Sequence, residues 1–425
     1  MRRNLPSWSY PNWKVNHSND EIIDEGKLPI VGGGRSFGDS NFFGNQVSSP
    51  VVDELMTFDV ETCLATFSGS VSIYDALSFL LSHSRTLPII PGTMHATIGG
   101  CIASDIHGKN SFKKGPFSQH LQSFRLETPT GIIEITDPDS EAWKCTVGGQ
   151  GLTGRITSAT VHTEEIFSTS LESKVVRTKN LEEHFELMSK FASGHDFVVG
   201  WIDGDTPGFR ERGYIEFCDE LNVFSKEVYE FPNLRTLWKN NYPRVKVVNW
   251  ISVGLFNYMN HFKSWLHSKK TRTTNRWNYM FPMSGLGNWN YFFGHSGFHE
   301  IQFSCNQDSI ESGIRLIREI ISQQRIFLIG IKLMSGTQNG YLAFPGQEWS
   351  IAVNFPATSD SPATVRRYQD QIILFEGRIN PTKDWCADKR IFQTMYPNWK
   401  KVQEYRESNG VKIESSFSKR VGISP

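Results

Sequence analysis

The sequence predicts an α+β protein with two lobes. Its 425 residues exceed the ~250–300 residues that a single hydrophobic core usually holds, so two or three domains are expected. The first third alternates short apolar runs with glycines, which is typical of many short strands. The middle third adds further strand-like runs and two amphipathic helices. This pattern favours an antiparallel sheet covered by helices.

Short strands in the first third are predicted by β-branched and apolar runs that stop at glycine, proline or a turn. They cover residues 28–31, 51–52, 63–67, 87–90, 132–135 and 156–163. A helix is predicted over 72–82, because its isoleucine and leucines recur at helical spacing.

The middle and last thirds contain clearer helical signals. Strands are predicted over 197–203 and 214–217. One helix is expected to begin at Asp308, with Glu311 completing a capping box. Another is expected to begin at Ser361 and to stop at Gly377.

Composition and charge exclude several classes of function. The 44 basic and 44 acidic side chains give no net charge, so there is no electrostatic case for nucleic-acid binding. Six cysteines occur without any CxxC pair, which favours free thiols in a reducing, cytoplasmic compartment over a zinc or dithiol site. No metal is expected. The longest apolar run, 326–331, is far shorter than the ~20 residues that cross a bilayer.

Three glycine-rich segments carry the functional signal. They read GGGRSFGDS from residue 32, PGTMHATIGGCIASDIHGKN from 91 and VGGQGLTGRI from 147. The third fits the pattern GxGxxG, but a strand pattern over 155–163 follows it where a Rossmann fold requires a helix. A single such loop is more often a plain turn. Three of them, with Asp105 and His107 nearby, favour a phosphorylated cofactor bound by backbone amides.

The order of these loops, followed by PTKD at 381–384, resembles the flavin-dependent oxidoreductases of the vanillyl-alcohol oxidase superfamily, which have a PCMH-type FAD-binding domain. Within it, the chain looks most like the decaprenylphosphoryl-β-D-ribose oxidase group, the flavin half of an epimerase pair. The likeness is strongest over 29–163 and 377–399. It implies an FAD-binding domain over 1–170, completed by 378–425, and a substrate domain over 171–377.

The resemblance implies which residues bind FAD. They are Gly32, Gly33, Gly34, Arg35, Ser36, Phe37, Gly38, Asp39, Ser40, Asn41, Gly92, Thr97, Ile98, Gly99, Gly100, Ser104, Asp105, His107, Ile156 and Asn380. Glycine amides suit a pyrophosphate, and small side chains let a flat ring come close. Many relatives attach the flavin covalently to a histidine two residues after the arginine of the first loop. Phe37 stands there in this chain, so we expect FAD to be bound non-covalently.

The resemblance also implies catalytic and substrate residues. Lys383 matches the family's active-site lysine, a cation that would stabilise the reduced flavin. Lys332 lies in an apolar strand pattern, where a buried ammonium requires an anion or a function; a solvent-facing lysine on an edge strand is the alternative. His107 matches a flavin-proximal histidine, and Gln302 and Trp201 match substrate-pocket positions. A lone histidine such as His107 is more often a hydrogen-bonded core residue, and Gln302 and Trp201 could each equally be core residues.

Three residues depart from the pattern expected in the closest relatives. They are Glu300, Asn354 and Asn380, the last at a position where the family often has an aromatic residue next to the flavin. These differences leave flavin binding intact and the exact substrate open.

The implied reaction is oxidation of a sugar hydroxyl to a keto sugar. The first hypothesis is the 2′-OH of a polyprenyl-phospho-β-D-ribofuranose, with a separate short-chain dehydrogenase completing epimerisation to the arabinose form. Two alternatives stay open: a soluble alditol or aldonolactone oxidase that uses oxygen, and a non-catalytic flavin-binding partner subunit. The basic, aromatic stretch 256–276 is typical either of a segment that touches the inner face of a membrane or of a cover over the substrate domain.

Overall fold

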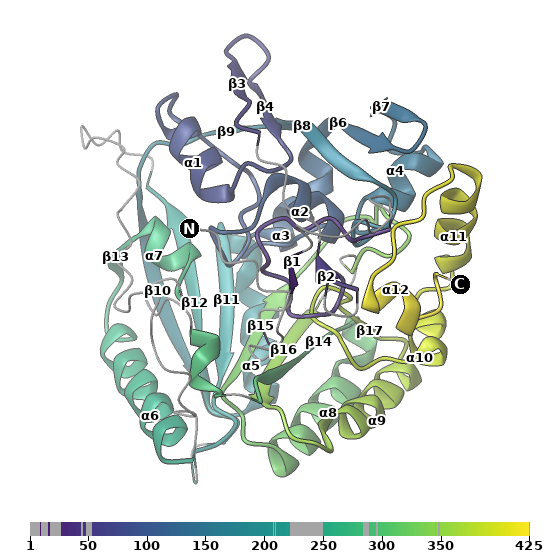
Figure 1. Cartoon of the computed structure of the whole chain (residues 1–425). Coiled ribbons are helices and arrows are strands. Elements are labelled where there is room, and N and C mark those ends of the chain that lie inside the picture. Colours follow the sequence, from purple (N-terminus) through teal and green to yellow (C-terminus); the bar gives the residue numbers. More distant parts are fainter. Residues whose placement is uncertain are drawn as a thin grey trace.

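Two antiparallel sheets organise the chain, one of five strands and one of eight (Figure 1). The structure is a computed structural model. It describes residues 9, 16–17, 27–43, 46–47, 53–206, 208, 210–221, 250–283, 289–294, 296–344, 346 and 349–424.

The five-stranded sheet forms the first lobe, with strand order β3-β4-β8-β6-β7. Its strands are β3 (Met56–Asp59), β4 (Leu64–Ser68), β6 (Leu121–Thr128), β7 (Gly131–Ile135) and β8 (Arg155–His162). The lobe also contains helices α1 (Ile73–Leu81), α2 (Ile98–Ser104), α3 (Ser111–Lys114) and α4 (Glu141–Thr146). Two short pairs are separate from both large sheets, β1 (Asn16–His17) with β2 (Gln46–Val47) and β5 (Arg85–Thr86) with β9 (Glu164–Glu165).

The eight-stranded sheet forms the second lobe, in the order β13-β10-β12-β11-β15-β16-β14-β17. Its strands are β10 (Ser170–Thr178), β11 (Phe197–Ile202), β12 (Gly213–Glu220), β13 (Arg272–Asn275), β14 (Phe298–Cys305), β15 (Leu328–Leu333), β16 (Trp349–Pro356) and β17 (Arg378–Ile379). Its helices are α5 (Leu181–Phe191), α6 (Trp250–His267), α7 (Arg276–Met280), α8 (Ile310–Gln323) and α9 (Ser361–Leu374).

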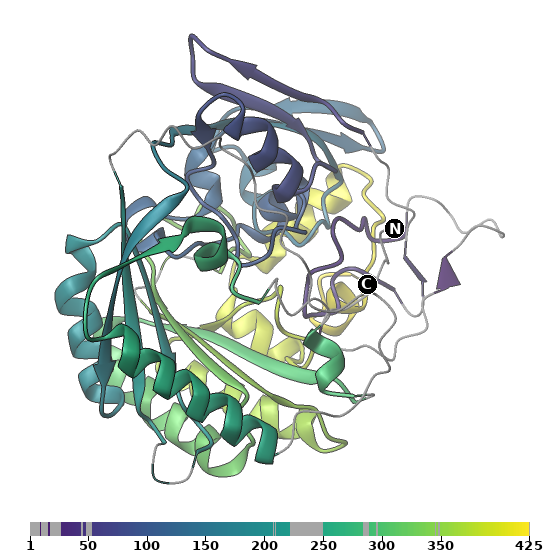
Figure 2. The same cartoon turned by 90° about the vertical axis from the view of Figure 1, so that its left-hand side faces the viewer.

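The two faces of this sheet differ because side chains alternate along each strand. Every second residue of β14 and β16, including Ile301, Phe303 and Ile351, packs in a core with α5, α8 and α9. The residues between them are largely polar, including Gln302 and Ser350. Figure 2 shows the first lobe above this sheet. The polar face is therefore available to the first lobe.

The C-terminal part of the chain joins the two lobes. Helices α10 (Lys389–Met395), α11 (Trp399–Ser408) and α12 (Ser416–Arg420) run along one side of the molecule (yellow in Figure 1), where α11 contacts α4 and α10 contacts α9. The Arg420 guanidinium donates to Asp39 in the first glycine loop, at 2.6 and 2.9 Å, and to Asp384 at 2.9 Å. One cation therefore pairs with two buried carboxylates from distant parts of the sequence.

Most predicted elements are present. The strands expected at 63–67, 132–135, 156–163, 197–203 and 214–217 are β4, β7, β8, β11 and β12, and the helices expected at 72–82 and from Ser361 are α1 and α9. The strand that follows the GxGxxG match confirms that this match is not a Rossmann motif. The six cysteines are free thiols. None of the helices that the structure describes is both long and apolar enough to span a membrane.

Several local predictions are wrong. Residues 28–31 and 87–90 form no strand, and Pro29 and Pro88 lack the amide that a ladder requires. The predicted capping box is absent, because the Asn306 side chain instead accepts from the Ser309 amide, at 2.9 Å, before α8 begins. The strand predicted at 51–52 lies outside the described residues.

Replacing Arg420 by methionine is expected to lower the free energy of unfolding by about 3–5 kcal/mol. The substitution would leave Asp39 and Asp384 charged and buried with no cation between them. Urea unfolding followed by circular dichroism measures the change.

A matched control is Arg390→Met, which removes an exposed ion pair with Asp370 elsewhere in the C-terminal part. We expect little change from it. Equal losses of stability in the two variants would contradict the role given to Arg420.

Candidate active site

The first glycine loop is held by the segment 380–384. The carbonyl of Thr382 accepts from the amides of Phe37 and Gly38, at 3.0 and 2.9 Å, and from the Ser36 hydroxyl at 2.8 Å. A Cβ on Gly38 would lie 2.4 Å from the Asp384 carbonyl oxygen. Only glycine permits so close an approach of two backbones.

The same loop packs on the second glycine segment. A Cβ on Gly33 would lie 1.9 Å from the carbonyl oxygen of His95. Among the described residues, the amides of Gly32, Gly33 and Gly34 donate to no protein acceptor. Successive amides left over in a turn form a concave site for an anion. This part of the loop therefore fits the pyrophosphate of FAD.

Helix α2 was not predicted, although it contains Gly99 and Gly100, the glycine pair of the second glycine segment. Thr97 caps the helix by accepting from the amide of Gly100 at 3.2 Å, and the amide of Gly99 donates to the Gly69 carbonyl at 2.9 Å. These amides are already used within the protein. The missing side chains instead let other parts of the protein come close, since a Cβ on Gly99 would lie 3.0 Å from the Gly69 carbonyl oxygen and one on Gly100 would lie 3.1 Å from Thr97 Oγ1.

Asp105 lies directly after α2, with left-handed backbone geometry (φ 40°). Its carboxylate is fully buried and accepts from the Ser118 amide at 3.0 Å. Burial raises the pKa of Asp105 to about 7. The residue thus fixes the chain that leads to His107. Ser104 precedes it at the end of α2, and Ile156 lies in β8 beside Gly69.

His107 joins the first lobe to the polar face of the second. The Gln302 amide nitrogen donates to His107 Nε2 at 2.9 Å and to Ser350 Oγ at 2.8 Å, while Gln302 Oε1 accepts from Asn380 Nδ2 at 2.8 Å. Burial, with the cations Lys332 and Lys383, holds the pKa of His107 well below its usual range. The imidazole is therefore neutral, which lets Nε2 accept this hydrogen bond.

Lys383 lies beside the first glycine loop. Its Nζ is 3.3 Å from the centroid of the Phe37 ring and 3.4 Å from Glu300 Oε1. Glu300 Oε2 also accepts from Asn354 Nδ2 at 2.8 Å. Two residues that depart from the expected pattern are therefore hydrogen-bonded to each other. The ammonium is placed at the junction of the loop and the polar sheet face.

Lys332 and Lys109 add positive charge to this face. Burial lowers the pKa of Lys332 to about 8, and the neighbouring cations Lys109 and Lys383 act in the same direction. Burial also lowers the pKa of Lys109 to about 8. The Lys109 ammonium donates to the Tyr279 carbonyl and lies 3.8 Å from the centroid of that ring.

Trp201 lies on the same sheet face as Gln302, in one cross-strand row with Gly330 and Ala352 between them. Its ring contacts Tyr214 and His261 of α6, with centroids 5.4 and 5.6 Å away. A substrate role for Trp201 stays a prediction. The remaining first-loop residues keep structural partners: Ser36 faces Ser40 at 3.3 Å, and burial lowers the pKa of Arg35 to about 10.

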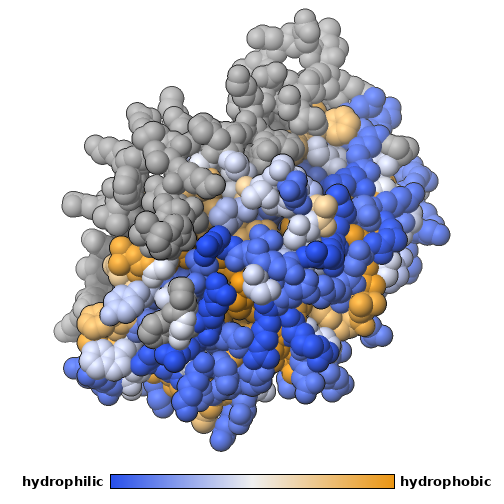
Figure 3. Space-filling view, turned by 90° about the horizontal axis from the view of Figure 1, so that it is seen from below, coloured by the Kyte–Doolittle hydropathy of each residue, from blue (hydrophilic) through white to orange (hydrophobic). Residues whose placement is uncertain are grey.

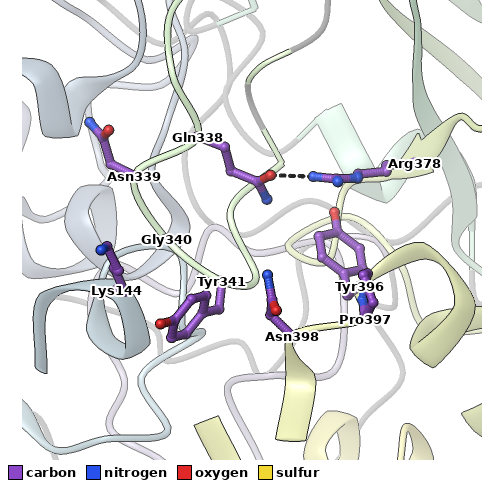
Figure 4. A pocket seen from close by; sticks show the side chains of 9 residues that line it. All are labelled: Lys144, Gln338, Asn339, Gly340, Tyr341, Arg378, Tyr396, Pro397 and Asn398. Carbon is purple, nitrogen blue, oxygen red and sulfur yellow. Dashed lines mark hydrogen bonds between the residues drawn. The ribbon is translucent and has the colours of Figure 1, made fainter. Parts of the chain in front are cut away.

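A separate hollow of about 140 Å³ lies where α4, the 338–341 segment and the C-terminal part meet (Figure 4). Arg378 reaches across it to Gln338. It contains none of the predicted cofactor residues, and it is smaller than the ~300–1,000 Å³ of typical ligand sites. It belongs to the junction of the lobes and is not the flavin site.

Sequence reasoning missed several members of the site. Thr382 and Ser350 contact predicted residues, and Gln150 Nε2 in turn donates to Thr382 Oγ1 at 3.3 Å. Lys109 and Thr382 lie inside the quoted motifs and could have been found there. Ser350 carries no local signal, because only strand pairing places it beside Gln302.

Comparison with known proteins adds independent support. Residues 24–137, which contain the first two glycine segments, match the FAD binding domain family. The chain is 28% identical to the decaprenylphosphoryl-β-D-ribose oxidase of Mycolicibacterium smegmatis, over 94% of this chain and 90% of that protein.

Two other relatives match over shorter regions. An uncharacterised Streptomyces coelicolor protein is 32% identical over 31% of this chain and 36% of its own length. A D-lactate dehydrogenase of Anaerostipes hadrus is 22% identical over 41% of this chain and 39% of its own length. Taken with the converging glycine loops, these matches identify the chain as an FAD-dependent oxidoreductase with a PCMH-type FAD-binding domain, similar over most of its length to a decaprenylphosphoryl-β-D-ribose oxidase.

Proposed function

We propose that this protein oxidises the 2′-hydroxyl of a polyprenyl-phospho-β-D-ribofuranose to the keto sugar. The observation that carries the proposal is the convergence of three lysines at the polar sheet face. Lys332 in β15 has its pKa lowered by burial and by the neighbouring Lys109 and Lys383, and Lys383 lies 3.4 Å from Glu300 of β14. Glu300 is the carboxylate that acts on Lys332 in the opposite direction. Such a cationic face suits a phosphorylated sugar better than a neutral polyol. The name of the mycobacterial relative supports the ribose.

The residues around the cluster have distinct proposed roles. Bound FAD would supply the acceptor for the hydride that leaves the sugar carbon. Lys383 would stabilise the negative charge that results, and the neutral His107, fixed by Gln302, would orient the sugar. Lys332, with its pKa near 8, can exchange a proton at neutral pH and is our candidate acceptor of the hydroxyl proton.

The proposed reaction also implies partners. The ketone at C2 regains a hydroxyl only by reduction. A short-chain dehydrogenase is therefore expected to complete the epimerisation to the arabinose form. A polyprenyl carrier lies in a bilayer, and a cytoplasmic enzyme would meet it by peripheral contact with the inner face. The division into an FAD-binding domain (1–170 with 378–425) and a substrate domain (171–377) is part of the same proposal.

Anaerobic mixing with polyprenyl-phospho-ribose tests the function. We expect the visible flavin absorbance to bleach, and the product to carry a ketone at C2 of the sugar. Bleaching by soluble alditols or aldonolactones, with peroxide formed in air, would instead show an oxidase of small polyols. A folded, FAD-loaded protein that no polyprenyl-phospho-sugar or polyol bleaches would favour a non-catalytic flavin-binding subunit.

Replacing Lys383 by alanine is expected to leave FAD bound and to slow its reduction by substrate roughly 10²–10³-fold. The estimate follows from removing one preorganised charge next to the reacting centre. Stopped-flow absorbance measures the rate. The matched control is the exposed Lys400→Ala on α11, which should reduce at the wild-type rate. Near-normal reduction in the Lys383 variant would remove this lysine from the mechanism.

Acid precipitation of the purified protein is expected to release all of its FAD into the supernatant. The reason is that Phe37, which has no nucleophilic atom, stands where many relatives carry the attachment histidine. The Phe37 ring instead packs on Trp289 and Phe298, with centroids 6.1 and 5.2 Å away. Flavin that stays with the pellet would show a covalent link and overturn the expectation.

A further inference from the structure

Whereas Val253 in its first turns packs in an apolar cluster, helix α6 (Trp250–His267) from Asn257 onward buries polar side chains and exposes its large apolar ones. This is the reverse of an ordinary surface helix, in which the apolar stripe faces the core. Residues 257, 261 and 264 point inward at intervals of three and four, and they are Asn257, His261 and Ser264. This part of the helix therefore gains little of its stability from inward burial of apolar surface.

Polar contacts hold the inner face in place. Asn257 Nδ2 donates to Asp203 Oδ1 at 2.9 Å, and His261 Nε2 lies 3.6 Å from Asp203 Oδ2. Asp203 is fully buried at the end of β11. This contact fixes the rotation of α6, so its outer face is presented in one defined orientation.

The outer face is a continuous apolar stripe. Six large side chains recur at helical spacing, and each is between 42% and 60% exposed. They are Leu255, Tyr258, Met259, Phe262, Trp265 and Leu266. Figure 3 shows orange and pale side chains at the left edge of the lower face, where α6 lies in Figure 1. Such patches on soluble surfaces mark contacts with membranes or proteins.

Positive charge borders the stripe. Residues 250–299 contain no Asp or Glu, whereas Lys263, Lys269 and Lys270 are exposed around the helix. No described carboxylate lies within ion-pair distance of these three lysines. The Lys269 ammonium lies 3.6 Å from the centroid of the Trp265 ring. Aromatic residues with lysines beside them are the composition of helices that lie in an anionic bilayer interface.

Aromatic contacts continue from α6 to the active site. Phe256, on the edge of the helix, stacks on Phe327 with centroids 5.4 Å apart. Trp289 lies 6.1 Å from Phe327 and 6.1 Å from Phe37, the ring that contacts Lys383. A largely buried aromatic cluster thus connects α6 with the proposed catalytic lysine.

We propose that the outer face of α6 docks on an anionic lipid bilayer, which would place the membrane on the far side of the helix from the aromatic cluster that contains Phe37. The inference rests on the proposed function only in that a polyprenyl-phosphate substrate resides in the bilayer. The positive charge beside the stripe argues against self-association through it. A two-fold contact would bring Lys263, Lys269 and Lys270 of two copies close together.

Co-sedimentation with vesicles tests the proposal without any substrate, so it can fail independently of the reaction. The FAD-loaded protein is mixed with two kinds of vesicle. One is pure phosphatidylcholine, and the other is half phosphatidylcholine and half phosphatidylglycerol. We expect binding to the anionic vesicles. The double variants Met259→Ser/Phe262→Ser and Lys269→Glu/Lys270→Glu should each lower the partition coefficient roughly tenfold or more.

The matched control is Leu374→Ser, because Leu374 on α9 is 84% exposed and lies far along the chain from α6. It should bind vesicles like the wild type, and all variants should keep their FAD content. Wild-type protein that stays in the supernatant, or double variants that bind like the wild type, would overturn the proposal. A wild-type dimer in sedimentation velocity that Met259→Ser/Phe262→Ser dissociates would assign the stripe to self-association instead.

Discussion

The carbonyl of Thr382 is the contact on which the site depends. It accepts from two amides and one hydroxyl of the first glycine loop, and Arg420 reinforces it by holding Asp39 and Asp384 together. This side of the loop is occupied, whereas no acceptor in the described part of the chain takes the amides of Gly32 to Gly34. The loop can then bind a phosphate group without a helix N-terminus, in contrast to a Rossmann fold.

The eight-stranded sheet presents polar side chains toward the first lobe because side chains alternate between its two faces. One face of β14, β15 and β16 builds the core, so the other face is left with Gln302, Lys332 and Ser350. Because the first lobe covers this face, groups that strands would otherwise expose to water are partly desolvated. That is why the pKa values of His107 and Lys332 fall, and why charge on this face has strong effects.

The sequence predicted elements well where apolar residues recur at a regular strand or helix spacing, as in β8 and α9. It predicted them poorly where individual glycines and prolines determine the backbone. Helix α2 was missed because Gly99 and Gly100 are poor helix formers, and contact with Gly69 overrides their propensity. Residues 28–31 looked like a strand, but Pro29 cannot complete a ladder. The link between His107 and Gln302 spans 195 positions and follows from how the lobes pack, which no local pattern encodes.

The bond between Ser36 and Thr382 joins residues 346 positions apart, and the one between Asp39 and Arg420 spans 381. A ribosome releases the first glycine loop long before it synthesises the segment that closes it. The nascent N-terminal lobe must therefore persist with its cofactor cradle incomplete until nearly the whole polypeptide has emerged. Flavin capture is consequently expected to be a late, post-translational event, and the supply of cofactor then acts on a nearly finished molecule.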